Sequence, residues 1–225
     1  MSAVRLGGFC LVAFVPILVV GALLYSRIGV SSQTDGSTAL KRIAEAGASF
    51  PIVNALFHLG ALLLIPAGVS LATSLRTADV GPWIDIGMGF LILAVVVAAG
   101  FVFSLNHGLW VIATGPGITS EGASPAYSAA ADSNLATQRG AELVQSMGLG
   151  LWLLASATAM AAAGWPTWLV GLSVLGGAGF IVAGLSSVLM SVPVVGPALG
   201  ALGALGLVMF MVWDLATGIR LLSLT

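Results

Sequence analysis

Polar side chains inside long apolar runs are the residues of this sequence that could do chemistry. Six of them fall near one end of three predicted helices: Asn54, His58, Asn106, His107, Glu142 and Gln145. A polar side chain in hydrocarbon is costly, so such residues are the first candidates for a ligand or proton site. Because an α-helix rises about 1.5 Å per residue, all six could lie at a similar depth, about 5 to 10 Å inside one membrane interface.

Several interpretations of this polar group stay open. The side chains of His58, His107 and Glu142 are of the types that bind zinc or copper, and a histidine beside a carboxylate can relay protons. The two histidines could also be the axial ligands of one haem. Alternatively, the amides and His58 hydrogen-bond across helices and only hold the bundle together. On this last interpretation we expect no cofactor.

Two further carboxylates lie toward the opposite end of the predicted helices. Asp85 is near the start of the third apolar run, and Asp214 is about two turns from the end of the sixth, so Asp214 is the deeper one. A buried carboxylate needs a partner, and the cations on this side are Arg5, Arg76 and Arg220. We expect a structural ion pair for Asp214, with a proton-coupling role as the alternative.

The composition places the whole chain in a lipid bilayer. The 225 residues are 59% hydrophobic and 7% charged, whereas soluble domains carry about 25% charged residues. A net charge of -1 supplies no basic field, so nucleic acid is not an expected partner. Cys10 is the single cysteine, which excludes an internal disulfide and cysteine-based metal centres. The sequence has no nucleophile elbow, zinc-protease motif or P-loop, so we do not expect an enzyme.

Hydropathy predicts an all-α fold, a polytopic transmembrane helical bundle in one domain over residues 1–225. Each apolar run is long enough to cross the roughly 30 Å hydrocarbon layer. The six predicted spans are residues 7–26, 51–75, 83–112, 141–163, 168–190 and 196–222. Polar loops at 27–50 and 113–140 lie on the same face, and the first should hold a short interfacial helix capped by Ser37 or Thr38.

Small residues at four-residue spacing predict where the helices touch, because they let helix backbones approach closely. Such triplets occur in the last three spans: Ala155, Ala159 and Ala163; Gly179, Ala183 and Ser187; Gly196, Gly200 and Ala204. The pattern predicts close packing but does not say which helix meets which.

Two C-terminal segments carry a family resemblance. Residues 164–171 (GWPTWLVG) and 212–222 (VWDLATGIRLL) resemble the turn before the fifth span, and the closing tryptophan, glycine and basic pattern, of the six-helix bacterial proteins called domain-of-unknown-function 4386. The likeness covers about the last 80 residues. The first half matches in hydropathy and span order, with Asp85 alone where that family has an Arg and a Glu in its third span. The resemblance implies a six-span membrane fold and no particular activity.

An even number of spans places both termini on one side of the membrane. The Lys and Arg residues are nearly balanced between the two faces, with three on the terminal side and four on the other. The weakly charged 113–140 segment favours an extracytoplasmic position. We therefore expect a multi-pass protein of the plasma (inner) membrane with cytoplasmic termini.

Three functions fit these observations. The first is a non-enzymatic protein, either an accessory subunit that packs against other membrane proteins or a second copy of itself, or a binder of lipid-like molecules. The second is a small secondary transporter or channel with three-plus-three symmetry and a polar path near His58, His107 and Glu142, or Asp214. The third is a metal- or haem-binding redox subunit. A cavity that reaches the middle of the bilayer would favour transport, and a fully packed bundle would oppose it.

Overall fold

The protein is almost entirely helical, which confirms the predicted all-α class. A computed structural model describes residues 2–31, 33–76, 80–119, 122–189 and 195–224. The helices are α1 (Ala3–Ile28), α2 (Gly36–Ala46), α3 (Ser49–Leu75), α4 (Gly81–Val96), the π-helical η1 (Val97–Val102), α5 (Phe103–Ala113), α6 (Pro125–Ala162), α7 (Thr167–Leu189) and α8 (Val195–Ser223). The strands β1 (Ile118–Thr119) and β2 (Gly122–Ala123) pair as a short antiparallel ribbon.

Six helices of the described chain are long and apolar enough to cross a bilayer. They are α1, α3, the continuous helix Gly81–Ala113 formed by α4, η1 and α5, then α6, α7 and Ala198–Ser223 of α8. Their outer faces carry exposed aliphatic side chains, such as Leu23, Val96 and Ile219, each about 60% exposed. Exposing so large an apolar surface to water is energetically unfavourable, whereas lipid chains solvate it. The chain is a multi-pass integral membrane protein.

Helix α6 is longer than the sequence analysis expected. Residues 113–140 were predicted to be a polar loop, but from Pro125 onward they are helical, and α6 runs for 38 residues to Ala162. The hydroxyl of Ser124 caps the helix at the Tyr127 amide, and Pro125 occupies the first turn. The segment is also rich in alanine, the strongest helix former. At about 57 Å, α6 extends well beyond the hydrocarbon layer.

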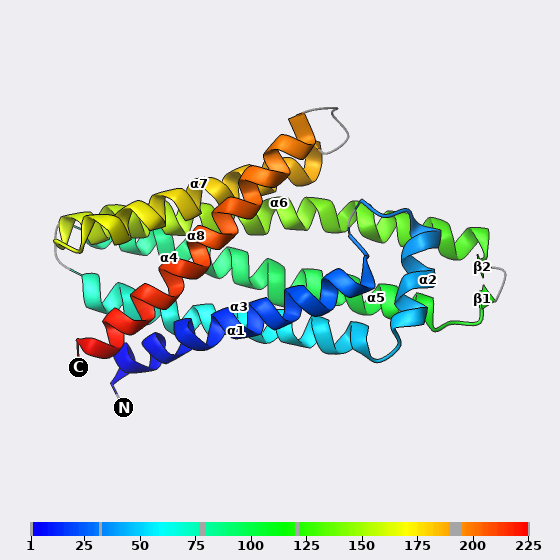
Figure 1. The fold of residues 1–225 in the computed structure, drawn as a ribbon, viewed down its shortest axis with the longest axis horizontal. Helices are drawn as coiled ribbons and strands as arrows, with labels where there is room; N and C mark the ends of the chain where they lie inside the picture. Colours follow the sequence, from blue (N-terminus) through cyan, green and yellow to red (C-terminus); the bar gives the residue numbers. More distant parts are fainter. Residues whose placement is uncertain (1, 32, 77–79, 120–121, 190–194, 225) are drawn as a thin grey trace.

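The predicted interfacial helix is present as α2, but its cap differs from the prediction. Asp35, rather than Ser37 or Thr38, is the N-cap: its carboxylate accepts a hydrogen bond from the Thr38 amide at 2.9 Å and from the Ser37 hydroxyl at 2.8 Å. These bonds to the ionised form lower the pKa of Asp35 to about 2. Helix α2 lies crosswise at one end of the bundle (Figure 1), with Ile43 fully buried.

Glycine contacts set how α8 crosses the bundle. Helix α8 runs obliquely over it (Figure 1) and meets α1 where Gly8 faces Gly218, so close that a Cβ on Gly8 would lie 2.8 Å from the Gly218 carbonyl. Toward its other end α8 packs on α7, where a Cβ on Gly179 would overlap the backbone of Gly206. A Cβ on Gly203 would lie 2.8 Å from the Cβ of Ala183. The predicted α7 contacts at Gly179 and Ala183 are thus confirmed.

Of the contacts predicted on α8, the one at Ala204 is not observed, and Gly196 lies outside the part of the chain whose packing the structure describes. Gly203 and Gly206 make the close approach to α7, and neither belongs to the predicted Gly196, Gly200 and Ala204 triplet. Ala204 is exposed.

Candidate functional site

A cavity of about 330 Å³ lies inside the bundle. It is lined by α1, α3, α4, η1, α5 and α6, together with Phe180 of α7 and Leu207 and Phe210 of α8. Its polar lining consists of Tyr25, Asn54, His58, Asn106, Gln138, Glu142 and Gln145. The remaining lining side chains are aliphatic or phenylalanine.

The cavity has one polar end and one apolar end. Along α1 the lining passes from Tyr25, near α2, to Phe14 in the middle of the helix; along α6 it passes from Gln138 to Leu149. Eleven residues separate the ends on each helix, which corresponds to about 16 Å. This length is about half the hydrocarbon thickness. The cavity therefore extends from near the end of the bundle that carries α2 to about the middle of the membrane-spanning helices.

Five of the six predicted polar residues line this cavity: Asn54, His58, Asn106, Glu142 and Gln145. His107 is the exception. It follows Asn106 directly, and consecutive residues of a helix point about 100° apart, so Asn106 is buried at the cavity while His107 is exposed. Depth could be predicted from hydropathy, whereas the direction of each side chain could not.

The predicted metal set is not brought together. His58 lines the cavity with its ring 4.6 Å from that of Phe103, and Glu142 lines it from α6, but His107 lies outside. Among the described residues no group of three or more His, Cys, Asp or Glu is close enough to hold a metal ion. His107 is likewise not placed to share a haem with His58.

Two lining residues were missed by the sequence analysis. Tyr25 was assigned to the boundary of the first span, and Gln138 to the polar loop. The spacing of Gln138, Glu142 and Gln145 is four and then three residues, which puts all three on one helix face. A helical reading of residues 125–140 would have added Gln138 to the predicted site.

Several polar atoms at this end have no hydrogen-bond partner within the described chain. They are His58 Nδ1, Asn106 Oδ1 and Gln138 Oε1. Asn106 is 8% exposed and Gln138 4%. Leaving a buried polar atom unpaired costs about 1–3 kcal/mol. The cross-helix hydrogen bonds expected of purely structural side chains therefore do not form at these atoms.

The polar end of the cavity carries an acidic side chain and no described Lys or Arg. Glu142 is the charged lining residue, and no Lys or Arg lines the part of the cavity that the structure describes. A cation or a neutral hydrogen-bonding group is compatible with this field, and an anion is repelled.

An aromatic cluster closes the apolar end. The ring of Phe210 contacts Phe14 with centroids 5.7 Å apart and Phe180 at 5.0 Å. Behind it Trp213 stacks on Phe210 at 6.2 Å and meets Trp152 edge to face at 5.6 Å. These rings separate the cavity from the half of the bundle that carries the chain termini.

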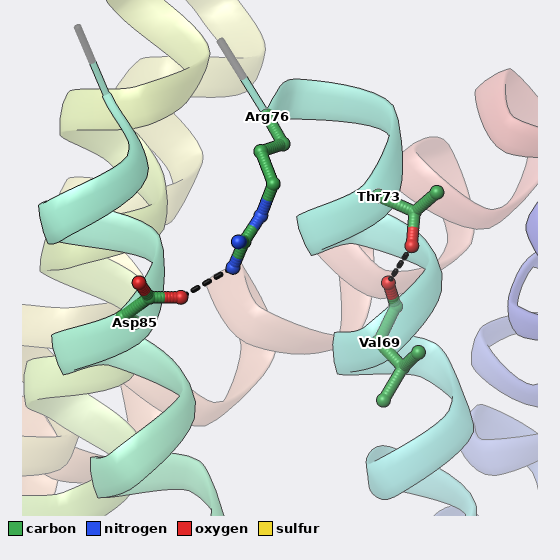
Figure 2. Close-up of polar contacts among 4 residues, drawn as sticks. All are labelled: Val69, Thr73, Arg76 and Asp85. Carbon is green, nitrogen blue, oxygen red and sulfur yellow. Dashed lines mark hydrogen bonds and ion pairs between the residues drawn. The ribbon is translucent and has the colours of Figure 1, made fainter. Parts of the chain in front are cut away.

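Asp214 lies beyond this cluster, and the ion pair expected for it is absent. Figure 2 shows that Arg76 instead pairs with Asp85, at a surface position where both side chains are more than half exposed. One turn before Arg76 on α3, the Thr73 hydroxyl donates a hydrogen bond to the Val69 carbonyl at 2.8 Å, within the same helix, and so does not reach Asp214 either.

The other two cations expected near Asp214 also do not pair with it. Arg5 is exposed, and the Arg220 guanidinium lies over the Trp165 ring at 4.7 Å. Asp214 itself is 0% exposed, and neither carboxylate oxygen has a partner among the described residues. The prediction of a structural ion pair for Asp214 is therefore wrong.

Comparison with family models, curated proteins and solved structures gave no match to this chain.

Proposed function

We propose that this protein binds a small amphipathic, lipid-like molecule in the cavity, with the ligand's polar group near Glu142 and its apolar part toward Phe210. The observation that supports this most directly is the division of one cavity into a polar half and an apolar half. Ligand sites are commonly apolar, with a few convergent polar groups that fix orientation. The unpaired amide oxygens of Asn106 and Gln138 favour a bound partner.

The size of the cavity favours a single-chain or ring-shaped ligand. About 330 Å³ is at the lower end of the range for small-molecule sites. A cavity of this size suits the polar group and upper chain of a single-tailed amphiphile better than a phospholipid with two acyl chains.

The lining favours a neutral or cationic polar group on the ligand. Glu142 and the amides offer carboxylate and carbonyl acceptors, and no lining Lys or Arg is described that would compensate a phosphate or carboxylate. Unpaired like charges across an interface cost several kcal/mol. Amines, hydroxyls and amides are therefore the expected headgroups.

Entry from the bilayer is compatible with the helix arrangement. Leu18 of α1 and Leu207 of α8 both line the cavity and are only half-buried. Between them the two helices diverge, since α8 crosses α1 near Gly218 and then follows α7 (Figure 1). An apolar molecule could thus enter sideways, without passing through water.

A headgroup comparison tests the proposal. Dodecylamine, dodecyl glucoside and dodecyl phosphate share one chain, and binding is read as the rise in unfolding temperature of the protein in lipid nanodiscs. We expect stabilisation by the amine and the glucoside only. Glu142→Gln should abolish the effect of the amine and keep that of the glucoside. Glu45→Gln, on the exposed surface of α2, is the matched control.

A second pair of variants tests whether the cavity is the binding site. Ala98→Phe fills the cavity from η1 and should remove stabilisation by every amphiphile, whereas Ala55→Phe adds the same ring to the exposed face of α3. Equal stabilisation by all three headgroups, or unchanged binding in Ala98→Phe, would contradict the proposal.

A second candidate function is transport. A cavity that extends from the α2 end of the bundle to Phe14, Phe180 and Phe210 in its middle lies where secondary carriers hold their substrates. Uptake of a fluorescent alkylamine into proteoliposomes, lost in Ala98→Phe, would support transport. Binding without uptake would leave the protein a binder. The accessory-subunit role stays a prediction, which co-purification from native membranes would test.

We also propose that the protein lies in the bacterial inner membrane, in line with its resemblance to domain-of-unknown-function 4386, and that its termini are cytoplasmic, because the weakly charged segment 113–140 on the opposite face favours an extracytoplasmic position. Both termini lie at the same end of the bundle (Figure 1), opposite α2. The polar end of the cavity would then face the extracytoplasmic side. A C-terminal green fluorescent protein fusion should fluoresce in cells, and a dark but full-length fusion would reverse the orientation.

A further inference from the structure

We infer that Asp214 is a proton-binding site inside the bundle, held as a neutral carboxylic acid in a polar cluster with Trp213 and Thr217 of α8. All three residues are 0% exposed. Within the described chain, no hydrogen-bond partner is present for Trp213 Nε1, Asp214 Oδ1 and Oδ2, or Thr217 Oγ1. Four unpaired polar atoms on five successive residues of one helix are far more than native interiors usually tolerate.

An ionised Asp214 would have nothing to balance its charge. A bare carboxylate in an apolar interior is so unfavourable that the group neutralises instead. No ion pair to Asp214 is present among the described residues, and no set of three metal-ligating side chains occurs there either. Binding one proton removes the charge without any other partner.

The helices around Asp214 bring no charge to it. On α1, which packs here through Gly8 and Phe14, the nearest titratable side chains are the buried Cys10 and, farther toward the surface, the exposed Arg5. Helix α7, and α3 and α6 at this depth, carry no titratable residue, as the sequence of residues 59–75, 143–162 and 167–189 shows. On α4, Asp85 is paired with Arg76 at the surface.

The remaining cation belongs to α8 itself and faces elsewhere. Arg220 follows Asp214 by six residues, which places it about 120° away around the helix. Its guanidinium lies over the Trp165 ring in the turn between α6 and α7. Arg220 therefore does not balance the charge of the Asp214 carboxylate.

A protonated Asp214 can complete the hydrogen bonding of the cluster. The acid form has one O–H donor and keeps acceptor capacity. Thr217 follows Asp214 by three residues, and side chains at this spacing are neighbours on a helix surface. A rotation of the two side chains therefore pairs the carboxyl with the Thr217 hydroxyl, with no movement of the helix.

The position of Asp214 makes this proton independent of the cavity. Asp214 is one turn beyond Phe210, on the terminal side of the aromatic cluster. It lies between Phe210, which contacts Phe14, and Gly218, which contacts Gly8. Loss of the proton would leave a bare charge at the crossing of α1 and α8, so deprotonation should loosen that crossing.

Infrared spectroscopy of the protein in nanodiscs tests the inference without any ligand. We expect a carboxylic-acid C=O band at neutral pH that is lost in Asp214→Asn and kept in Asp85→Asn, because the Asp85 side chain is exposed and paired with Arg76. If Asp214→Asn loses only carboxylate bands, the inference is wrong. Because no amphiphile is involved, this result is separate from the outcome of the binding experiments.

The Thr217→Val variant provides a second infrared test, and this test does not depend on whether Asp214→Asn folds. It replaces the hydroxyl by a methyl group of nearly the same size. We expect the C=O band to remain and to shift in frequency, because the acid loses its hydrogen-bond partner. Absence of the acid band in a folded Thr217→Val protein that retains Asp214 would overturn the inference.

Discussion

Phe14 of α1 meets Phe210 of α8 edge to face, with ring centroids 5.7 Å apart and an interplanar angle of 67°. Both rings line the cavity, and both lie near the middle of their helices. This contact therefore sets how deep the cavity extends into the membrane. It also joins the first and last spans of the chain.

Phe210→Ala should deepen the cavity and destabilise the bundle. Removing a buried aromatic ring from a core costs about 3–5 kcal/mol, and Phe210 is 1% exposed. We expect that loss in the free energy of unfolding, together with binding of amphiphiles with a longer chain than the wild type accepts. Phe101→Ala, at a 49% exposed lipid-facing position, should change neither. A variant that lost stability but kept the original chain-length limit would argue against Phe210 as the floor.

Gly206→Ala should separate α7 from α8. The added Cβ would overlap the backbone of Gly179, and a backbone cannot move aside as a flexible side chain does. We expect destabilisation of about 1–3 kcal/mol, as for other overpacked sites. Gly89→Ala is the matched control, since a Cβ there meets nothing within 4 Å. Alanine should stabilise that helix by up to about 1 kcal/mol.

The attachment of α2 should weaken at acid pH through Asp35. Its pKa is lowered to about 2 in the folded protein by hydrogen bonds from Thr38 and Ser37, from an unfolded value of about 3.9. A lowered folded pKa adds stability that is complete above the unfolded value and is lost as the pH falls through about 2. The hydrogen-exchange protection factors of α2, which are corrected for the intrinsic exchange rate at each pH, should therefore fall over that window. In Asp35→Ala these protection factors should already be low at neutral pH and should not change over the same window.

Gln138→Leu should separate stability from binding. The Oε1 atom of Gln138 is buried without a partner among the described residues, and an apolar replacement of similar shape removes that penalty. We expect the ligand-free protein to be at least as stable as the wild type, while binding of dodecyl glucoside becomes several-fold weaker. Thr137→Leu, on the exposed neighbouring position, should leave binding unchanged. Unchanged glucoside binding in Gln138→Leu would remove this residue from the site.

The number of spans and the depth of the polar residues could be predicted because both depend on hydropathy alone. Asn54 and His58 share a helix face through their four-residue spacing, and both line the cavity. The choice between Asn106 and His107 could not be made, because it depends on how the whole helix is rotated against its neighbours. Ser124 and Pro125 are residues typical of a helix start, and they cap and begin α6. The segment was nevertheless predicted to be a loop because its composition is polar.

Partners of buried charges were the least predictable feature. A buried carboxyl such as that of Asp214 needs its charge balanced or removed, but burial alone does not determine whether a cation, a hydrogen-bond donor or a proton does so. Arg76 was the correct type of partner for a carboxylate on this side, and it reaches Asp85 on the neighbouring helix (Figure 2). Pairing depends on distances between helices, which no spacing within one helix contains.

The π-helical turn η1 changes the direction in which the following residues of the third membrane-spanning helix point. In a regular α-helix, residues twelve apart such as Ala94 and Asn106 end about 120° out of step, yet both line the cavity. The wider turns of Val97–Val102 absorb that drift. Deleting one residue there, for example Gly100, would leave Ala94 and Asn106 eleven residues apart, which a uniform α-helix turns only about 20° out of step. The variant should therefore lose the π-helical turn and still present the amide of Asn106 to its chamber, with the membrane topology intact.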